Sequence, residues 1–175
     1  MTQLEDKLKT LSPVVVGVFC LLAVERSSFI YKVFAEKFSG SSENFYTILD
    51  QAFELVFSRN KSQLDGLKKE LEALIPDTEV YSDVLADQAQ CSTICLMYSL
   101  EYIASKDVSM AFFALQKIAE SIEIYEYEND KKKVFQDEKE WQKELLIKIN
   151  HPPEVLKQEL ETIRKLNREY MLPVV

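Results

Sequence analysis

The fold of this chain is decided by an apolar stretch near its N-terminus, Pro13-Val14-Val15-Val16-Gly17-Val18-Phe19-Cys20-Leu21-Leu22-Ala23-Val24. Ser12 precedes the stretch, and serine followed by proline is typical of a helix start, with serine as the N-cap and proline in the first turn. The run is shorter than the roughly 20 apolar residues that a membrane-spanning helix needs. Glu5 and Asp6 upstream argue against a secretory signal peptide. We therefore expect a buried helix and no membrane contact.

The helical period continues along the rest of the chain. Apolar side chains recur at steps of three and four residues, which is the pattern of helices with one buried face. Gly40 and Pro76 mark helix ends, and Asp107 is a typical N-cap. The expected helices cover a short segment up to Leu11, then about residues 13–38, 43–57, 60–75, 82–104, 108–128 and 137–150, and a last helix that begins at His151-Pro152-Pro153. No stretch alternates convincingly with period two. The sequence therefore predicts one all-α domain of seven or eight helices over residues 1–175.

Composition excludes several kinds of chemistry. The net charge of −8 and the pI near 4.8 argue against a nucleic-acid groove, because such a groove needs clustered Lys and Arg. The chain has a single His, and its three glycines are too far apart for a phosphate-binding loop. Cys91 and Cys95 share a helix face, but nothing brings Cys20 or His151 beside them, so we expect buried reduced thiols rather than a zinc site. Reduced thiols suit the cytoplasm. We expect no metal, no cofactor and no enzymatic activity.

Negative charge is concentrated in the middle of the chain. Residues 76–130 hold 2 basic and 11 acidic side chains, whereas the segments on either side are close to neutral. Five acidic residues lie within eleven positions that contain no Lys or Arg: Glu120, Glu123, Glu126, Glu128 and Asp130. Such a run is commonly a solvated helix face. The functional alternative is an acidic docking surface for a basic protein.

Glu25 and Arg26 follow directly after the apolar run, so at least one of these charges is expected to be buried and paired. Candidate partners for Arg26 are Asp50, Glu54 and Asp87. This predicts a buried charge cluster of Glu25, Arg26, Asp50, Glu54 and Asp87. The cluster is either a structural ion pair or the wall of a functional pocket.

The order and spacing of several short segments resemble the YjaG-type bacterial family of uncharacterised function over nearly the whole length. The matching segments are Glu25-Arg26, Leu49-Asp50 with Glu54, Leu71-Glu72 running into Ile75-Pro76-Asp77-Thr78-Glu79, Ala86 to Ala89, and Glu138-Lys139-Glu140-Trp141-Gln142. The resemblance implies an all-helical cytoplasmic bacterial domain and supplies no agreed activity. It also implies that relatives can occur beside toxin genes, where small acidic proteins often act as immunity proteins.

Three functions follow from these observations as hypotheses. The first is a non-enzymatic binding module whose acidic face engages a basic protein, such as a toxin that it neutralises. The second is an enzyme or small-ligand binder that uses the charge cluster at Glu25 and Arg26 and nearby acids. The third is a housekeeping bundle that forms a homo-oligomer through one apolar helix face.

Overall fold

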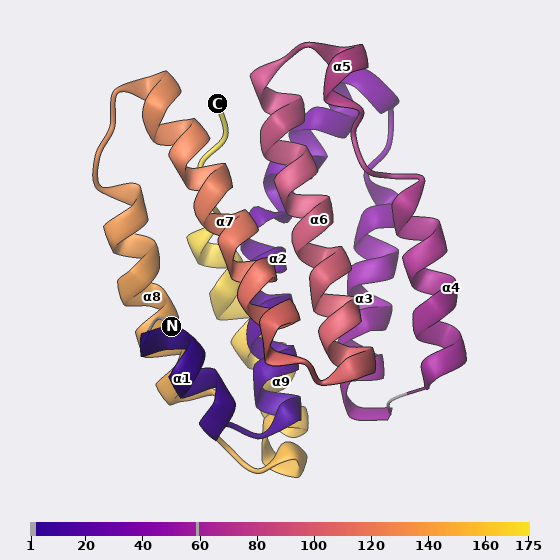
Figure 1. Cartoon of the computed structure of the whole chain (residues 1–175), viewed down its shortest axis with the longest axis vertical. Coiled ribbons are helices and arrows are strands. Elements are labelled where there is room, and N and C mark those ends of the chain that lie inside the picture. The colour runs from indigo at the N-terminus through magenta and orange to yellow at the C-terminus, as the bar shows by residue number, and fades with distance from the viewer. Residues whose placement is uncertain (1–2, 59) are drawn as a thin grey trace.

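A computed structural model describes residues 3–58 and 60–175 of the chain. The apolar run lies in helix α2 (Pro13–Phe34), which passes through the middle of the bundle (Figure 1). The Ser12 side chain accepts a hydrogen bond from the Val15 N–H at 3.3 Å, and Pro13 opens the helix, as expected. Every residue from Val14 to Ser28 is buried. Because helices pack on all sides of α2, no face of this helix needs to be polar.

The apolar helix extends beyond the twelve-residue apolar run, so its length does not exclude a membrane-spanning helix as we expected. Among the described residues, Pro13–Phe38 is long and apolar enough to cross a membrane. The most apolar window of this helix is 94% buried inside the bundle. α2 therefore resembles a core helix because neighbouring helices bury it, and not because its apolar run is short.

Between α2 and the next helical hairpin, the chain follows the expected boundaries closely. α2 continues into a π-helical turn, η1 (Ala35–Ser39), which ends at Gly40 with φ +90°. Next come α3 (Glu43–Ser58), α4 (Lys61–Glu72) and the short α5 (Thr78–Tyr81). Asp77 caps α5 by accepting hydrogen bonds from the Glu79 and Val80 N–H groups. We had not expected α5 as a separate helix.

Two long helices form an antiparallel hairpin packed along α2: α6 (Val84–Ser105) and α7 (Val108–Asn129). Asp83 caps α6, and Asp107 caps α7 as the sequence predicts. Gly17 of α2 lies directly against Val56 of α3. A Cβ atom at this position would lie 2.5 Å from Val56 Cγ2, so the packing leaves room only for glycine.

The remaining helices flank this centre: α1 (Gln3–Thr10), α8 (Val134–Lys148) and α9 (Pro153–Asn167), which ends in a 3₁₀ turn, η2 (Arg168–Tyr170). α8 begins at Val134 and not at Asp137 as the sequence suggests. The reason is a cap from another helix, because the Phe135 N–H donates to the Glu126 carboxylate of α7 at 2.9 Å. A cap that comes from another helix cannot be predicted from the residues next to the helix start.

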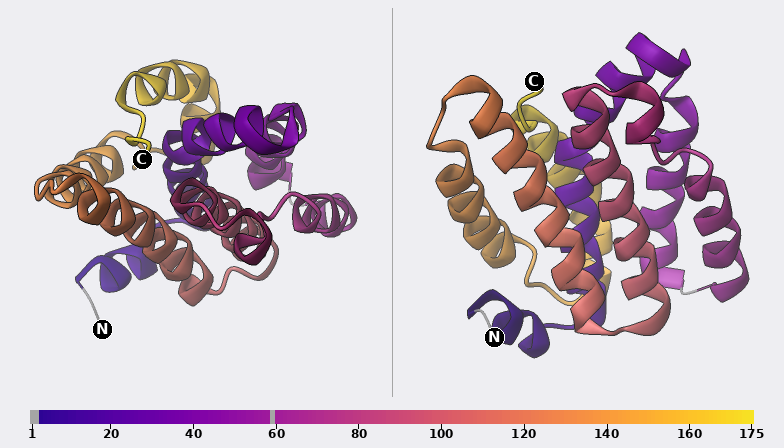
Figure 2. Two further views of the ribbon diagram at one scale, coloured as in Figure 1. Left: turned by 90° about the horizontal axis from the view of Figure 1, so that it is seen from above. Right: turned by 45° about the horizontal axis from the view of Figure 1, so that its top comes forward.

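The C-terminal segment runs into the bundle. The Leu172 N–H donates to the Arg26 carbonyl at 2.9 Å, and the Val175 N–H donates to the buried Gln88 side chain at 3.0 Å. The view from above in Figure 2 shows the C-terminus near the centre of the molecule. Within residues 3–58 and 60–175 the regular elements are all helices and none is a strand, so the all-α prediction is confirmed.

Candidate functional site

Arg26 is buried, with 8% of its surface exposed, as the sequence predicts. Its partner is Glu138 of α8, whose carboxylate Oε2 lies 2.6 Å from Nη1 of Arg26. Neither atom has another hydrogen-bond partner among the described residues. The Nε of Arg26 also donates to the Tyr170 carbonyl at 2.6 Å, and the guanidinium carbon lies 4.1 Å from the centre of the Trp141 ring. Arg26 therefore ties α2 to α8 and to η2.

The expected partners of Arg26 were wrong. Glu54 and Asp87 are exposed on α3 and α6, and neither belongs to the buried cluster. Asp50 is also exposed, and it contacts Arg164 instead of Arg26. Successive residues of a helix point about 100° apart, so Glu25 and Arg26 face different neighbours. Arg26 faces α8, whereas Glu25 faces α9.

Glu25 is the centre of a second buried network. Its carboxylate accepts from Nε of Arg164 at 2.8 Å, from Arg168 at 3.0 Å and from the Asn167 amide at 3.1 Å. Arg164 reaches on to Asp50 at 2.5 Å. Glu25 is 2% exposed, so these donors take the place of water around its charge. The two networks together fasten α8, α9 and the C-terminal turn to α2.

Burial shifts the protonation equilibria of these groups. Loss of water raises the pKa of Glu138, and the nearby Arg26 and Gln142 only partly oppose this effect. The same loss of water lowers the pKa of Arg26, against the attraction of Glu138. For Arg164 the burial effect is outweighed by Asp50 and Glu25, which raise the pKa of its guanidinium. For Arg26 and Glu138, the effect of losing water on the pKa is therefore larger than the effect of their mutual attraction.

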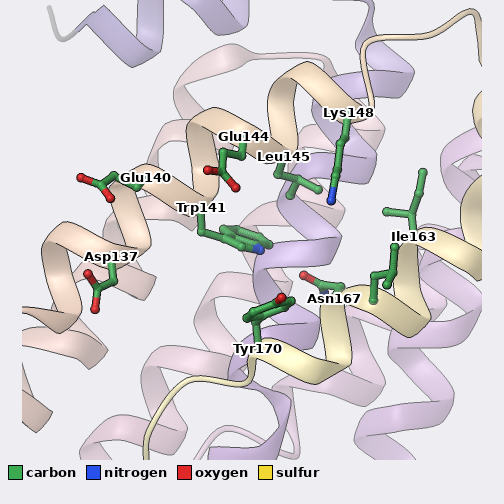
Figure 3. A pocket seen from close by; sticks show the side chains of 10 residues that line it. Asp137, Glu140, Trp141, Glu144, Leu145, Lys148, Ile163, Asn167 and Tyr170 are labelled. Carbon is green, nitrogen blue, oxygen red and sulfur yellow. The ribbon is translucent and has the colours of Figure 1, made fainter.

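A pocket of about 290 Å³ lies beside these networks, between α8 and the α9–η2 segment. Figure 3 shows Trp141 in its middle, with Tyr170 and Asn167 facing the tryptophan from η2 and α9. Leu145, Ile163 and Leu166 supply apolar contacts. The charged lining comes from α8: three carboxylates and one amine, namely Asp137, Glu140, Glu144 and Lys148.

Asn167 is the unusual residue of this pocket. It is 4% exposed, and its amide nitrogen donates to the Leu22 carbonyl at 2.9 Å and to Glu25. Its carbonyl oxygen Oδ1 is buried and has no hydrogen-bond partner among the described residues. A buried acceptor without a donor is uncommon, because each one costs the free energy of its lost hydration. Asn167 lines the pocket, so this unsatisfied acceptor belongs to a residue of the pocket wall.

The structure leaves the acidic run of α7 at the surface. Two of its five residues have local roles, since Glu120 pairs with Lys117 and Glu126 caps α8. Lys117 lies just outside the eleven positions, so the run has one counter-charge nearby. Glu123, Glu128 and Asp130 are exposed and form no ion pair in the part of the chain that the structure describes. The run and the buried charge cluster are separate features.

The three thiols are buried, as expected: Cys20, Cys91 and Cys95. Loss of water raises the pKa of Cys20 and of Cys91 to about 12, and raises that of Cys95 well above its ordinary value. The thiols are therefore protonated at neutral pH. No group of three or more potential metal ligands gathers within the described residues.

The pocket around Trp141 was not among the sites expected from the sequence. The available signal was the spacing in α8, because residues at steps of three and four share a helix face. Asp137, Glu140 and Glu144 follow this spacing with Trp141 and Lys148. The contribution of Asn167 could not be read from sequence, because its pairing depends on how α9 packs on α2.

Comparison with known proteins gives one family. The model of a family described as "Protein of unknown function (DUF416)" matches residues 3–171. No curated protein and no solved structure gives a significant match. Because the family match covers nearly the whole chain, the resemblance to YjaG-type proteins is confirmed, and the chain belongs to the DUF416 (YjaG-like) family, whose function is unknown.

Proposed function

We propose that this protein is a non-enzymatic binding protein that takes a cationic hydrogen-bond donor, an ammonium or guanidinium group, into the pocket between α8 and α9. The observation that carries the proposal is the Oδ1 atom of Asn167, a buried acceptor without a donor on the pocket wall. A ligand N–H group would remove the cost of this unpaired atom.

The charges of the pocket favour a cation over a neutral donor. Asp137, Glu140 and Glu144 outnumber Lys148 on the lining, and none of the three forms an ion pair within the described residues. The aromatic rings of Trp141 and Tyr170 provide apolar contact for the carbon part of a ligand. The volume of about 290 Å³ is near the lower end of small-molecule sites, which favours a compact amine over a folded partner.

Lys148 is a cation of the protein itself that reaches into the pocket, as Figure 3 shows. No hydrogen bond joins it to Asn167. If a ligand cation occupies this space, the ammonium of Lys148 repels that cation and weakens binding. Replacing Lys148 by methionine should therefore tighten the binding of an amine.

The test is calorimetric titration with agmatine, cadaverine and spermidine, and with a short peptide that carries a single arginine. Saturable binding of at least one probe is expected. Glu140→Gln/Glu144→Gln should weaken it about tenfold or more, because charge-assisted hydrogen bonds contribute about 1.5 kcal/mol or more each. Lys148→Met should strengthen it. Tighter binding of the peptide than of the free amines would indicate that the natural ligand of the pocket is a basic side chain of another protein.

The matched control is Glu123→Gln/Glu128→Gln, which removes the same charge from the acidic run of α7. Equal weakening by both double variants would show only a general effect of net charge and would overturn the pocket proposal. Absence of binding for every probe would also overturn it.

A second candidate function is docking of a basic protein, such as a toxin, on the acidic run. One observation favours it: Tyr127, which is 86% exposed, lies between the unpaired Glu123 and Glu128. Exposed tyrosines are common anchors at protein interfaces. In this case a pull-down from the cytoplasm of the host should recover a basic protein that Glu123→Gln/Glu128→Gln loses and Glu140→Gln/Glu144→Gln retains. Recovery of the same protein by both variants would exclude this docking mode.

A further inference from the structure

The opposite side of α8 carries a second and larger cavity. Its volume is about 760 Å³, and residues of α1, α7 and α8 line it. The walls are mainly apolar and come from all three helices: Leu4, Phe112, Leu115, Ala119, Phe135 and Leu146. A cavity of this size with apolar walls and a few polar groups is typical of small-molecule sites.

The polar groups of this cavity have the opposite sign from those of the first pocket. Lys7 of α1 and Lys139 and Lys143 of α8 line it. The Lys139 ammonium lies 4.1 Å from the centre of the Phe135 ring. In the described part of the chain, none of these three lysines forms an ion pair with a carboxylate. α8 thus presents carboxylates to one cavity and ammonium groups to the other.

The only carboxylate on this lining is already neutralised. Glu138 holds Arg26 at 2.6 Å and accepts a hydrogen bond from the Gln142 amide at 2.9 Å. Its charge therefore does not compensate the lysines, and the cavity has an excess of positive charge beside mainly apolar walls. An occupant that matches both features has a flexible hydrocarbon part and one anionic end.

We propose that the cavity between α1, α7 and α8 binds an alkyl carboxylate, a free fatty acid, with its chain among the apolar side chains and its carboxylate at Lys7, Lys139 and Lys143. The proposal uses different residues from the amine pocket, so either one can fail while the other holds.

The experiment is titration of the full chain with octanoate, decanoate and dodecanoate below their micellar concentrations. Dodecanol and dodecylammonium serve as probes that have the same alkyl chain as dodecanoate and a different head group. Affinity should rise about fourfold for each added methylene until the cavity is full. Dodecanoate should bind more tightly than dodecanol, and dodecylammonium should bind most weakly. Equal affinity for all three heads would overturn the proposal.

Two variants distinguish the contribution of the ligand's head group from that of its alkyl chain. Lys139→Gln/Lys143→Gln should weaken dodecanoate about tenfold and leave dodecanol unchanged, whereas the control Lys132→Gln/Lys133→Gln, in the loop before α8, should change neither. Ala119→Phe adds a side chain to the cavity wall without removing a buried one, and it should abolish the binding of both ligands while the helical circular dichroism is retained. Unchanged binding in Ala119→Phe would overturn the proposal. Association with phosphatidylglycerol vesicles that survives Ala119→Phe, without dodecanoate binding, would assign the lysines to a membrane surface and would also overturn it.

Discussion

Replacing Arg26 by methionine should destabilise the protein strongly. Methionine keeps most of the apolar contact of the arginine side chain but removes its charge. Glu138 is 3% exposed, and its Oε2 atom has no other hydrogen-bond partner among the described residues, so this carboxylate is left stranded. The hydrogen bond from Arg26 to the Tyr170 carbonyl is lost as well.

The expected loss is about 3–5 kcal/mol of unfolding free energy, the usual cost of breaking a buried ion pair from one side. Domains are typically stable by about 5–15 kcal/mol, so this is a large share of the total. For a chain of this length each kcal/mol lowers Tm by about 2–4 °C. The Tm of Arg26→Met should therefore fall by about 6–20 °C.

The loss should also depend on pH. Burial raises the pKa of Glu138, so the folded state holds this proton more tightly than the unfolded state. A group of this kind contributes its stability in full below the unfolded pKa, and that contribution disappears as pH rises through the folded pKa. Without Arg26 the pKa of Glu138 rises further. The difference between parent and Arg26→Met should therefore be smallest in acid and should increase as pH rises through the titration of Glu138.

Urea denaturation followed by the fluorescence of Trp141, the single tryptophan, measures this difference directly. The control is the double variant Arg26→Met/Glu138→Leu, which removes both charges and should regain at least about 2 kcal/mol of the loss, because no charge is stranded. A loss below about 1 kcal/mol in Arg26→Met at neutral pH would refute this reasoning. So would a double variant whose loss equals the sum of the two single losses.

Three further outcomes are expected. Gly17→Ala should lower stability by up to about 2 kcal/mol in denaturant titrations, because the contact with Val56 costs about 1–3 kcal/mol and the gain in helix propensity is about 1 kcal/mol; a stabilised variant would contradict the close packing. Glu25→Gln should lower the free energy of unfolding by several kcal/mol, because this carboxylate is buried. Asp50→Asn should lower it by less than about 1 kcal/mol, because its side chain is 62% exposed. Similar losses for both variants would show that burial does not decide the effect. The three cysteines should not react with Ellman's reagent in the folded protein at neutral pH and should react once urea unfolds it; fast reaction without denaturant would exclude the buried, protonated state.

Features that depend on neighbouring residues could be predicted from the sequence. Ser12 before Pro13, Gly40 and Asp107 each act within one or two helical turns, through a hydrogen bond or a backbone conformation of their own segment. Helical periodicity is equally local. The all-α class and most helix boundaries therefore follow from the sequence, as does the burial of Arg26, which comes directly after an apolar run.

The features that the sequence reading missed depend on distant residues. α8 begins early because Glu126 of another helix caps it, and Arg26 pairs with Glu138, more than a hundred positions along the chain. Among the 29 acidic residues, nothing local distinguishes Glu138 from Asp50. The same holds for the unpaired oxygen of Asn167 and for the two cavities on either side of α8.

The physical reason is that a helix determines the direction of its own side chains but not what lies in that direction. Adjacent residues such as Glu25 and Arg26 point about 100° apart, and the helix that each one meets depends on how all the helices cross. Those crossings follow from packing the whole core around α2, including the close approach at Gly17. The sequence alone thus determined that a charge would be buried here, and only the tertiary structure decided which residues would pair with it and which cavities would form beside it.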